Sequence, residues 1–201
     1  MKTLESHMNE ALKIGKNLSK FSAYSYIPEN KEELENIINE RISKEGSNCD
    51  LNDIDTSLID DMSYLFDQSK FNGDISKWNV SNVKDMCRMF AHSIFNGNIS
   101  EWNVSNVQNM KGMFYTSKFN NDISDWDVSN VKFTQMMFSQ SKFNKDISAW
   151  DVSSVNNMWS MFASSEFNKD ISKWNIMPYC VTEYMFLNCP IKEEYKPKGI
   201  E

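Results

Sequence analysis

Apolar residues return at fixed positions every 24 residues along most of this chain. The clearest series is tryptophan, at Trp78, Trp102, Trp126, Trp150 and Trp174. Other apolar residue types keep the same register, as in Phe71, Phe95, Phe119, Phe143 and Phe167, or Ile75, Ile99, Ile123, Ile147 and Ile171. A fixed period of about 20 to 50 residues is typical of repeat proteins, in which each copy buries its apolar face against its neighbours.

Within one copy, the spacing of apolar residues changes. The stretch from Phe71 to Val80 indicates a short strand, whereas Val83, Met86 and Phe90 are spaced as on one face of a short helix. Each copy is therefore predicted to be a strand, a turn and a helix, with the strands of successive copies stacked in parallel. Since 24 residues is a leucine-rich-repeat length, we expect an α/β repeat fold, a solenoid of leucine-rich-repeat type with parallel short strands and an N-terminal helical cap.

The repeat divides the chain into three parts. Residues 1–46 are predicted to be the N-terminal helical cap, and residues 47–189 a solenoid of about six 24-residue repeats, the first of them degenerate. Residues 190–201 hold two prolines and many charges, and are predicted to be a C-terminal tail.

Two helices are expected in the cap. The first follows an apolar stripe from Leu4 to Leu18. The second begins after Asn30, a good N-cap with Glu33 three residues later, and ends before Gly46. A mobile targeting arm is the alternative interpretation of these residues.

Two polar columns accompany the apolar ones. One is Asn72, Asn96, Asn120, Asn144 and Asn168, and the other is Asp74, Asn98, Asp122, Asp146 and Asp170. The first is expected to bond the backbone of its own turn and of the neighbouring copy. The second is expected to accept N–H bonds within its own turn. Calcium along the second column is the alternative, because calcium takes oxygen ligands, but Asn98 interrupts it. We expect no metal and no cofactor.

Charge and composition exclude several classes of partner. The formal net charge is −7 and no cluster of Lys and Arg is present, which argues against nucleic acid. No segment approaches the ~20 apolar residues that span a membrane. The first residues lack the apolar run of a signal peptide, so a cytoplasmic location is expected, or the cell surface if a leader has been removed. The four cysteines form no CxxC pair, which favours reduced thiols over a zinc site.

No catalytic constellation is visible. Ser81, Ser105, Ser129 and Ser153 form a repeat column, whereas a hydrolase nucleophile is singular and paired with a histidine. His92 has no evident partner. The chain has six glycines and no phosphate-binding glycine motif. We therefore predict that the protein is not an enzyme.

Units such as FNGDISKWNVSNVKDMCRMF and FNNDISDWDVSN resemble the BspA-like leucine-rich-repeat family, the surface-protein repeat of about 25 residues found in mycoplasma and gut bacteria. The likeness covers about residues 48–189. It implies a right-handed solenoid of leucine-rich-repeat type, and a non-enzymatic adhesin or interaction protein. The chain departs from the family in having no visible secretion signal or cell-wall anchor, which favours an intracellular or phage-encoded relative.

A column here is the set of residues at equivalent positions of successive copies. Columns of one residue type serve packing, so the candidate binding residues are those that differ in type from the rest of their column. On the predicted helical side these are Trp159, Tyr184, Phe133 and Tyr115. Phe133 has a second interpretation, as a replacement for the core methionine that is missing at Thr134. The predicted strand side offers a row of mixed charge without an aromatic anchor, Lys77, Glu101, Asp125, Ala149 and Lys173.

These features predict a non-enzymatic protein–protein interaction module that acts inside a bacterial cell, for which a phage-encoded inhibitor of a host complex is one form. Its partner is expected to be a protein, with neither nucleic acid nor membrane. The alternatives are a secreted surface adhesin of the BspA-like type, and a structural protein that forms homo-oligomers.

Overall fold

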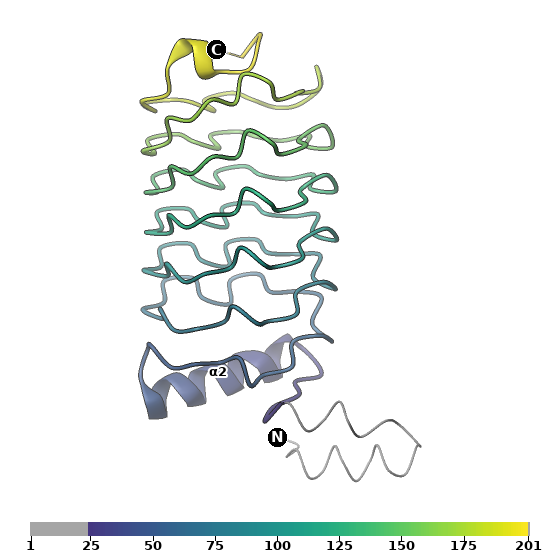
Figure 1. Ribbon diagram of the computed structural model, residues 1–201, viewed down its shortest axis with the longest axis vertical. Helices are drawn as coiled ribbons and strands as arrows, with labels where there is room; N and C mark the ends of the chain where they lie inside the picture. Colours follow the sequence, from purple (N-terminus) through teal and green to yellow (C-terminus); the bar gives the residue numbers. More distant parts are fainter. Residues whose placement is uncertain (1–23, 201) are drawn as a thin grey trace.

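The computed structural model describes residues 24–200, in which 24-residue coils are stacked one on another (Figure 1). The coils are numbered here from the amino-terminal end: coil 1 is 47–70, coil 2 is 71–94, coil 3 is 95–118, coil 4 is 119–142, coil 5 is 143–166 and coil 6 is 167–190. Helix α2 lies against coil 1, and a short tail follows coil 6 (Figure 1). The recurring apolar residues point inward and form one continuous core through the stack.

Helix α2 (Lys31–Glu45) begins and ends where its capping residues predict. The Asn30 side chain accepts the Glu33 N–H at 3.0 Å, and the Gly46 N–H donates to the Ile42 carbonyl at 2.9 Å. Gly46 has φ 89°, a backbone angle that glycine adopts without steric cost. The second predicted helix is therefore confirmed. The first, from Leu4 to Leu18, lies outside the described residues.

Both ends of α2 are fixed to coil 1. Near its start, the Lys31 ammonium bonds the Ser63 hydroxyl at 2.7 Å and pairs with the Asp61 carboxylate at 3.4 Å. Near its end, the Arg41 guanidinium bonds the Asp53 carboxylate at 2.8 Å and the Asp50 carbonyl at 2.8 Å. Since the buried face of α2 also belongs to the core, the helix covers the end of the stack as a preceding coil would.

Hydrogen bonds between coils hold the backbone of each coil. In coil 2, the N–H groups of Met86, Arg88, Phe90 and His92 donate to carbonyls of coil 3 at 2.7 to 2.9 Å. The equivalent four N–H groups of coils 1, 3, 4 and 5 donate to the next coil in the same way. We call these four alternate N–H groups the donor row of a coil. Between coils, the donor rows supply the pairing that buried backbone groups require.

The predicted fold class is wrong. Within residues 24–200 the helices are α2 and the 3-10 helix η2 (Glu193–Tyr195), and there are no extended strands. The coils form isolated parallel bridges instead, such as Asp61 to Asp85 and Asp85 to Asn109. The chain therefore does not form an α/β leucine-rich-repeat solenoid, in which each copy would contribute a strand and a short helix.

Left-handed backbone explains why no helix forms inside the coils. Two positions in every coil have φ between 53° and 61°: Tyr64, Gln68, Arg88, His92, Gly112, Thr116, Met136, Gln140, Ser160, Ser164, Tyr184 and Asn188. A right-handed helix cannot pass through such residues, and each non-glycine residue there costs roughly 1–2 kcal/mol. In coils 1 to 5 these residues belong to the donor row, so hydrogen bonds to the next coil offset that cost.

Stacked aromatic rings fill the core. Phe138 of coil 4 lies 5.7 Å from the ring centroids of both Phe114 and Phe162, its equivalents in the adjacent coils. The five indoles that recur every 24 residues are buried too, and each of their N–H groups donates to a carbonyl of the preceding coil, as from Trp126 to Ile99 at 3.1 Å. These columns are therefore packing residues, as their period indicates.

The polar columns satisfy the backbone. Each asparagine of the Asn72 column accepts an N–H from the residue 24 positions later, as Asn96 does from Asn120 at 2.8 Å. In the Asp74 column, each side chain accepts the N–H two residues on, as Asp74 does from Ser76 at 2.8 Å. The second column bonds within its own turn as the sequence predicts, whereas the first makes the predicted bond to the neighbouring coil and shows no side-chain bond to its own turn within residues 24–200.

The tail continues the coil pattern for only a few residues. Ile191 is buried in the place of the recurring phenylalanine, and the Tyr195 carbonyl accepts the Ile171 N–H at 3.0 Å. The Lys196 ammonium lies 5.8 Å from the ring centroid of Phe186. The tail therefore covers the start of coil 6 and its inward ring, without a hydrogen bond to the donor row of that coil.

Candidate interaction site

Trp159 and Tyr184 form an exposed aromatic pair near the carboxyl-terminal end of the stack. Their rings meet edge to face, with centroids 6.4 Å apart and an interplanar angle of 89°. Trp159 is 39% exposed and Tyr184 is 60% exposed. The backbone of Trp159 is fixed on both sides, since its N–H donates to the Asn157 side chain at 3.0 Å and its carbonyl accepts the Met136 N–H at 2.9 Å.

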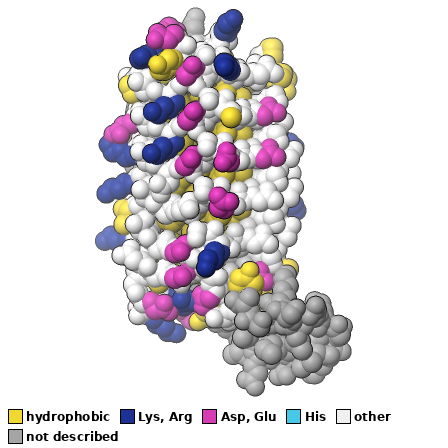
Figure 2. Space-filling model, in the orientation of Figure 1, with side chains coloured by type: hydrophobic (Ala, Val, Ile, Leu, Met, Phe, Trp, Pro, Cys, Tyr) yellow, Lys and Arg dark blue, Asp and Glu magenta, His cyan; other side chains and the backbone are white. Residues whose placement is uncertain are grey.

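More apolar side chains are exposed at this end of the molecule. Val181 is bridged to Asn157, and Leu187 follows Tyr184 by three residues in coil 6. Hydrophobic side chains reach the surface near the carboxyl-terminal end of the stack in Figure 2. We call the following residues the C-terminal patch: Phe133, Trp159, Val181, Tyr184 and Leu187.

Phe133 faces solvent and does not fill the core. It is 39% exposed, whereas Thr134 is buried in the position of the missing core methionine. In coils 1, 2, 3 and 5 the position of Phe133 holds an Asp or Asn, whose side chain accepts an N–H two residues on, as Asn157 does from Trp159. The Phe133 side chain cannot accept this bond, and it places an aromatic ring at the surface instead. The backbone bridge from Phe133 to Asn157 places it beside coil 5.

Tyr115 belongs to a different cluster. Its ring meets His92 edge to face with centroids 5.0 Å apart, and lies 5.9 Å from the Arg88 guanidinium. That guanidinium also lies 5.6 Å from the ring of Tyr64 in coil 1. The structure therefore brings Trp159 and Tyr184 together, but groups Tyr115 with residues of coils 1 and 2.

Sequence reasoning did not identify the exposed residues Tyr64 and Val181. Tyr64 occupies the same position in coil 1 as Tyr184 does in coil 6, and Val181 occupies the position of Asn157. In both cases the signal was a large side chain that departs from its column, since Tyr64 precedes Arg88 and Val181 follows Asn157. This signal was hard to recognise because coils 1 and 6 depart from the repeat pattern at many other positions too.

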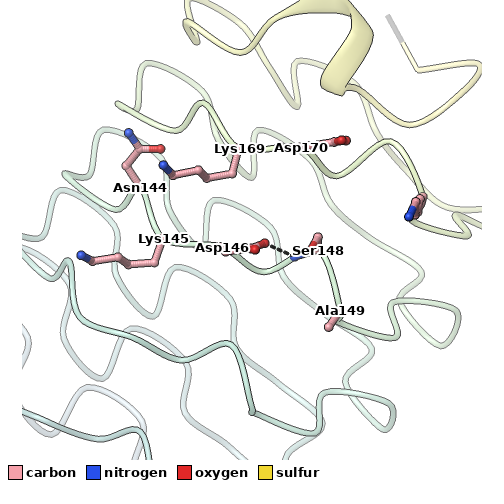
Figure 3. A pocket seen from close by; sticks show the side chains of 8 residues that line it. Asn144, Lys145, Asp146, Ser148, Ala149, Lys169 and Asp170 are labelled. Carbon is pink, nitrogen blue, oxygen red and sulfur yellow. Dashed lines mark hydrogen bonds between the residues drawn. The ribbon is translucent and has the colours of Figure 1, made fainter.

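A second surface lies on the predicted strand side. Two members of its mixed-charge row, Ala149 and Lys173, line a groove of about 740 Å³ in coils 5 and 6 (Figure 3). The other lining residues are Asn144, Lys145, Asp146, Ser148, Lys169 and Asp170. The Ser148 N–H donates to the Asp146 carboxylate at 2.9 Å, which lowers the pKa of that carboxyl. The groove is polar and lacks an aromatic anchor.

The described residues hold no group of three or more His, Cys, Asp and Glu side chains placed to bind a metal ion. Cys49, Cys87, Cys180 and Cys189 are free thiols, and burial raises the pKa of each one. A raised pKa keeps a thiol protonated and weakly nucleophilic at neutral pH. Within 24–200, no helix is long and apolar enough to cross a membrane.

Comparison with known proteins identifies the family. The family model described as Mycoplasma protein of unknown function, DUF285, matches residues 33–142 and 118–194. The chain belongs to this family. The DUF285 match begins inside α2 and ends in the tail, so it covers all six coils. No curated protein and no solved structure gives a significant match.

Proposed function

We propose that this DUF285 chain is a non-enzymatic protein-binding module, and that it holds its partner through the C-terminal patch. The observation that carries this proposal is the exposed Trp159–Tyr184 pair. Trp and Tyr are enriched among the few residues that dominate binding energy at interfaces. The other candidate surface, the polar groove around Ala149, has no comparable anchor.

The fixed backbone of Trp159 supports this role. A residue whose backbone is already held in place loses little backbone entropy on binding, so more of the contact energy of its side chain contributes to affinity. The edge-to-face contact with Tyr184 restricts both rings further. The pair is therefore suited to act as one anchor.

The proposed location and kind of partner are based on the sequence. The likeness to BspA-like repeats supports binding rather than catalysis. We propose action inside a bacterial cell on a protein partner, with a phage-encoded inhibitor of a host complex as the most specific form. Fractionation of the native host, followed by immunoblotting, tests the location.

The experiment compares equivalent tyrosines at the two ends of the stack. Tyr64 and Tyr184 occupy the same coil position, with φ 61° and 59° and similar exposures of 53% and 60%. The protein captures a partner from bacterial lysate, and the affinity of the purified partner is then measured by calorimetry. Trp159→Ala or Tyr184→Ala should weaken binding by about 30-fold, the effect of removing a hot-spot residue. Tyr64→Ala should leave it within a fewfold of wild type.

Circular dichroism shows whether each variant keeps its fold. If Tyr64→Ala and Tyr184→Ala weaken binding equally, the patch is not the site. If Lys173→Ala removes binding and Trp159→Ala does not, the polar groove is the binding surface. Light scattering addresses the homo-oligomer, and a stable dimer that buries Trp159 would replace this proposal.

A further inference from the structure

The donor row of coil 6 has no next coil. In coils 1 to 5, every N–H of the row donates to the following coil at 2.7 to 3.1 Å. In coil 6 the equivalent groups belong to Thr182, Tyr184, Phe186 and Asn188, and none of the four donates to any residue in the described part of the chain. Within residues 24–200 the stack therefore ends in a row of four backbone donors without acceptors.

The tail does not complete this edge. It covers the inward side, where Met185 is fully buried and Lys196 lies over the ring of Phe186. It leaves the outward side chains Tyr184 and Leu187 exposed, at 60% and 51%. An incoming segment would meet backbone donors along its length and apolar side chains on its outer flank, whereas its inner flank would face the tail, which favours small side chains there.

A second copy of this chain does not fit the edge. Two carboxyl-terminal ends placed together would set donors against donors. The matching acceptors are the carbonyls of coil 1, at positions equivalent to those that each later coil offers. Helix α2 is fixed across that end through Lys31 and Arg41, so a head-to-tail contact would require α2 to be displaced.

We propose that the partner adds a segment of its own backbone to coil 6. Alternate carbonyls of an extended partner segment accept the N–H groups of Thr182, Tyr184, Phe186 and Asn188, while its outer side chains pack on the C-terminal patch. Addition of a peptide to an open backbone edge is a known mode of recognition, in which main-chain bonds give affinity and side chains give specificity. This inference rests on the proposed function, and names the chemistry of the partner: an extended polypeptide segment with small residues on one side.

Hydrogen exchange of single amides, followed by NMR, tests the edge before any partner is added. The amides of residues 184, 186 and 188 should exchange faster than their equivalents in coil 5 at residues 160, 162 and 164, whose N–H groups are bonded. Equal protection in the monomer would show that the edge is already closed, and would overturn the inference.

The binding probe is a displayed library of short linear peptides, panned against the full chain. The best peptide is synthesised, and amide exchange is repeated in its presence. We expect protection of the donor row of coil 6, with the amides of coil 2 unchanged. Failure to enrich any peptide would overturn the inference, since it requires that an extended segment be sufficient for binding.

A backbone ester gives the sharpest variant, because it removes one N–H and keeps the side chain. Cys180 allows residues 180–201 to be joined chemically to the rest of the chain, with an ester in place of the peptide bond before Thr182. Loss of one hydrogen bond should weaken the peptide by about three- to tenfold. The matched control is the same ester before Glu183, whose N–H does not belong to the donor row.

The outcomes separate this inference from the proposed function. If Trp159→Ala removes peptide binding but the donor row stays unprotected and the Thr182 ester has no effect, the patch binds and the backbone edge does not. If the donor row becomes protected only as the protein concentration rises, a second copy occupies the edge and the inference fails. If the Thr182 and Glu183 esters weaken binding equally, the donor row has no special part in it.

Discussion

Replacement of Phe138 by alanine tests the stack where it is most densely packed. The Phe138 ring is fully buried, and its centroid lies 4.2 Å from that of Phe143 and 5.7 Å from those of Phe114 and Phe162. Trp150 is also near, at 6.3 Å. Phe138→Ala therefore removes contacts with both neighbouring coils, 3 and 5, together.

The expected loss can be estimated from this packing. A buried Phe→Ala change typically lowers the free energy of unfolding by about 3–5 kcal/mol. For a chain of this size, each kcal/mol corresponds to about 2–4 °C, so the melting temperature should fall by about 6–20 °C. Because natural domains have only about 5–15 kcal/mol in total, this one change would remove a large part of the stability.

Phe186 provides the matched control, because it holds the same position in coil 6. Its ring stacks on Phe162 at 5.8 Å and is covered on the other side by Lys196 instead of another ring. Phe186→Ala should therefore cost less, about 2 kcal/mol. Lys118→Ala, at an exposed position, should change stability by no more than about 0.5 kcal/mol.

Urea unfolding, followed by tryptophan fluorescence and by circular dichroism, measures all three variants. The reasoning requires the order Phe138→Ala, then Phe186→Ala, then Lys118→Ala. Equal shifts for the two phenylalanine variants would refute the claim that contacts across neighbouring coils provide the stability.

Three further changes test the backbone. Thr116→Gly should raise the unfolding free energy by about 0.5–1 kcal/mol, because Thr116 is exposed at φ 54°; a lower melting temperature would contradict this. Gly73→Ala should lower the unfolding free energy by about 1–3 kcal/mol, because an added Cβ would lie 1.9 Å from the Cys49 carbonyl oxygen; wild-type melting would argue against that contact. The hydrogen bond from the Ser76 N–H lowers the pKa of the Asp74 carboxyl in the folded state. The ionised Asp74 side chain therefore stabilises the fold at pH values above its unfolded pKa of about 3.9, and this contribution is lost as pH falls through the lower folded pKa. Asp74→Asn should therefore make the urea midpoint less sensitive to acid than in wild type, and an unchanged acid profile would count against this role.

The repeat and the core could be predicted from sequence because each position of a coil has one environment. All the tryptophans in the Trp126 column and all the phenylalanines in the Phe138 column are buried, so the repetition of one residue type was enough to predict the environment of each member. Helix α2 was predictable for a local reason, since the Asn30 cap and the Gly46 stop act within a few residues of the helix.

The conformation inside the coils could not be predicted in the same way. The spacing of Val83, Met86 and Phe90 fits a helix face, but also fits successive turns with their apolar residues pointing inward. What decides between them is the left-handed backbone of Arg88 and His92, and the arginine gives little sequence signal for it. The bonds that stabilise this backbone come from coil 3, so they cannot be seen in a single copy.

The candidate site was accessible in part. Trp159 and Tyr184 were identified because they break polar columns, and they are in contact in the structure. Tyr115 breaks a column too, but it packs with Arg88 and His92 in a separate cluster. The open donor row of coil 6 has no sequence signature, because it belongs to the backbone.

The donor rows also give the stack a net backbone dipole along its axis. At the junctions that follow coils 2 to 5, four donor-row N–H groups point toward the carboxyl-terminal end and no more than three backbone bonds, such as Gln108 N–H to the Lys84 carbonyl, run in the opposite sense. At the first junction the two directions are equal in number. The peptide dipoles therefore do not cancel as they do in most β-sheets. The excess of forward bonds leaves a net dipole along the stack, with its positive pole at coil 6 and its negative pole at coil 1. A longer array of the same coils would strengthen this field, and would draw acidic molecules more strongly toward its carboxyl-terminal end.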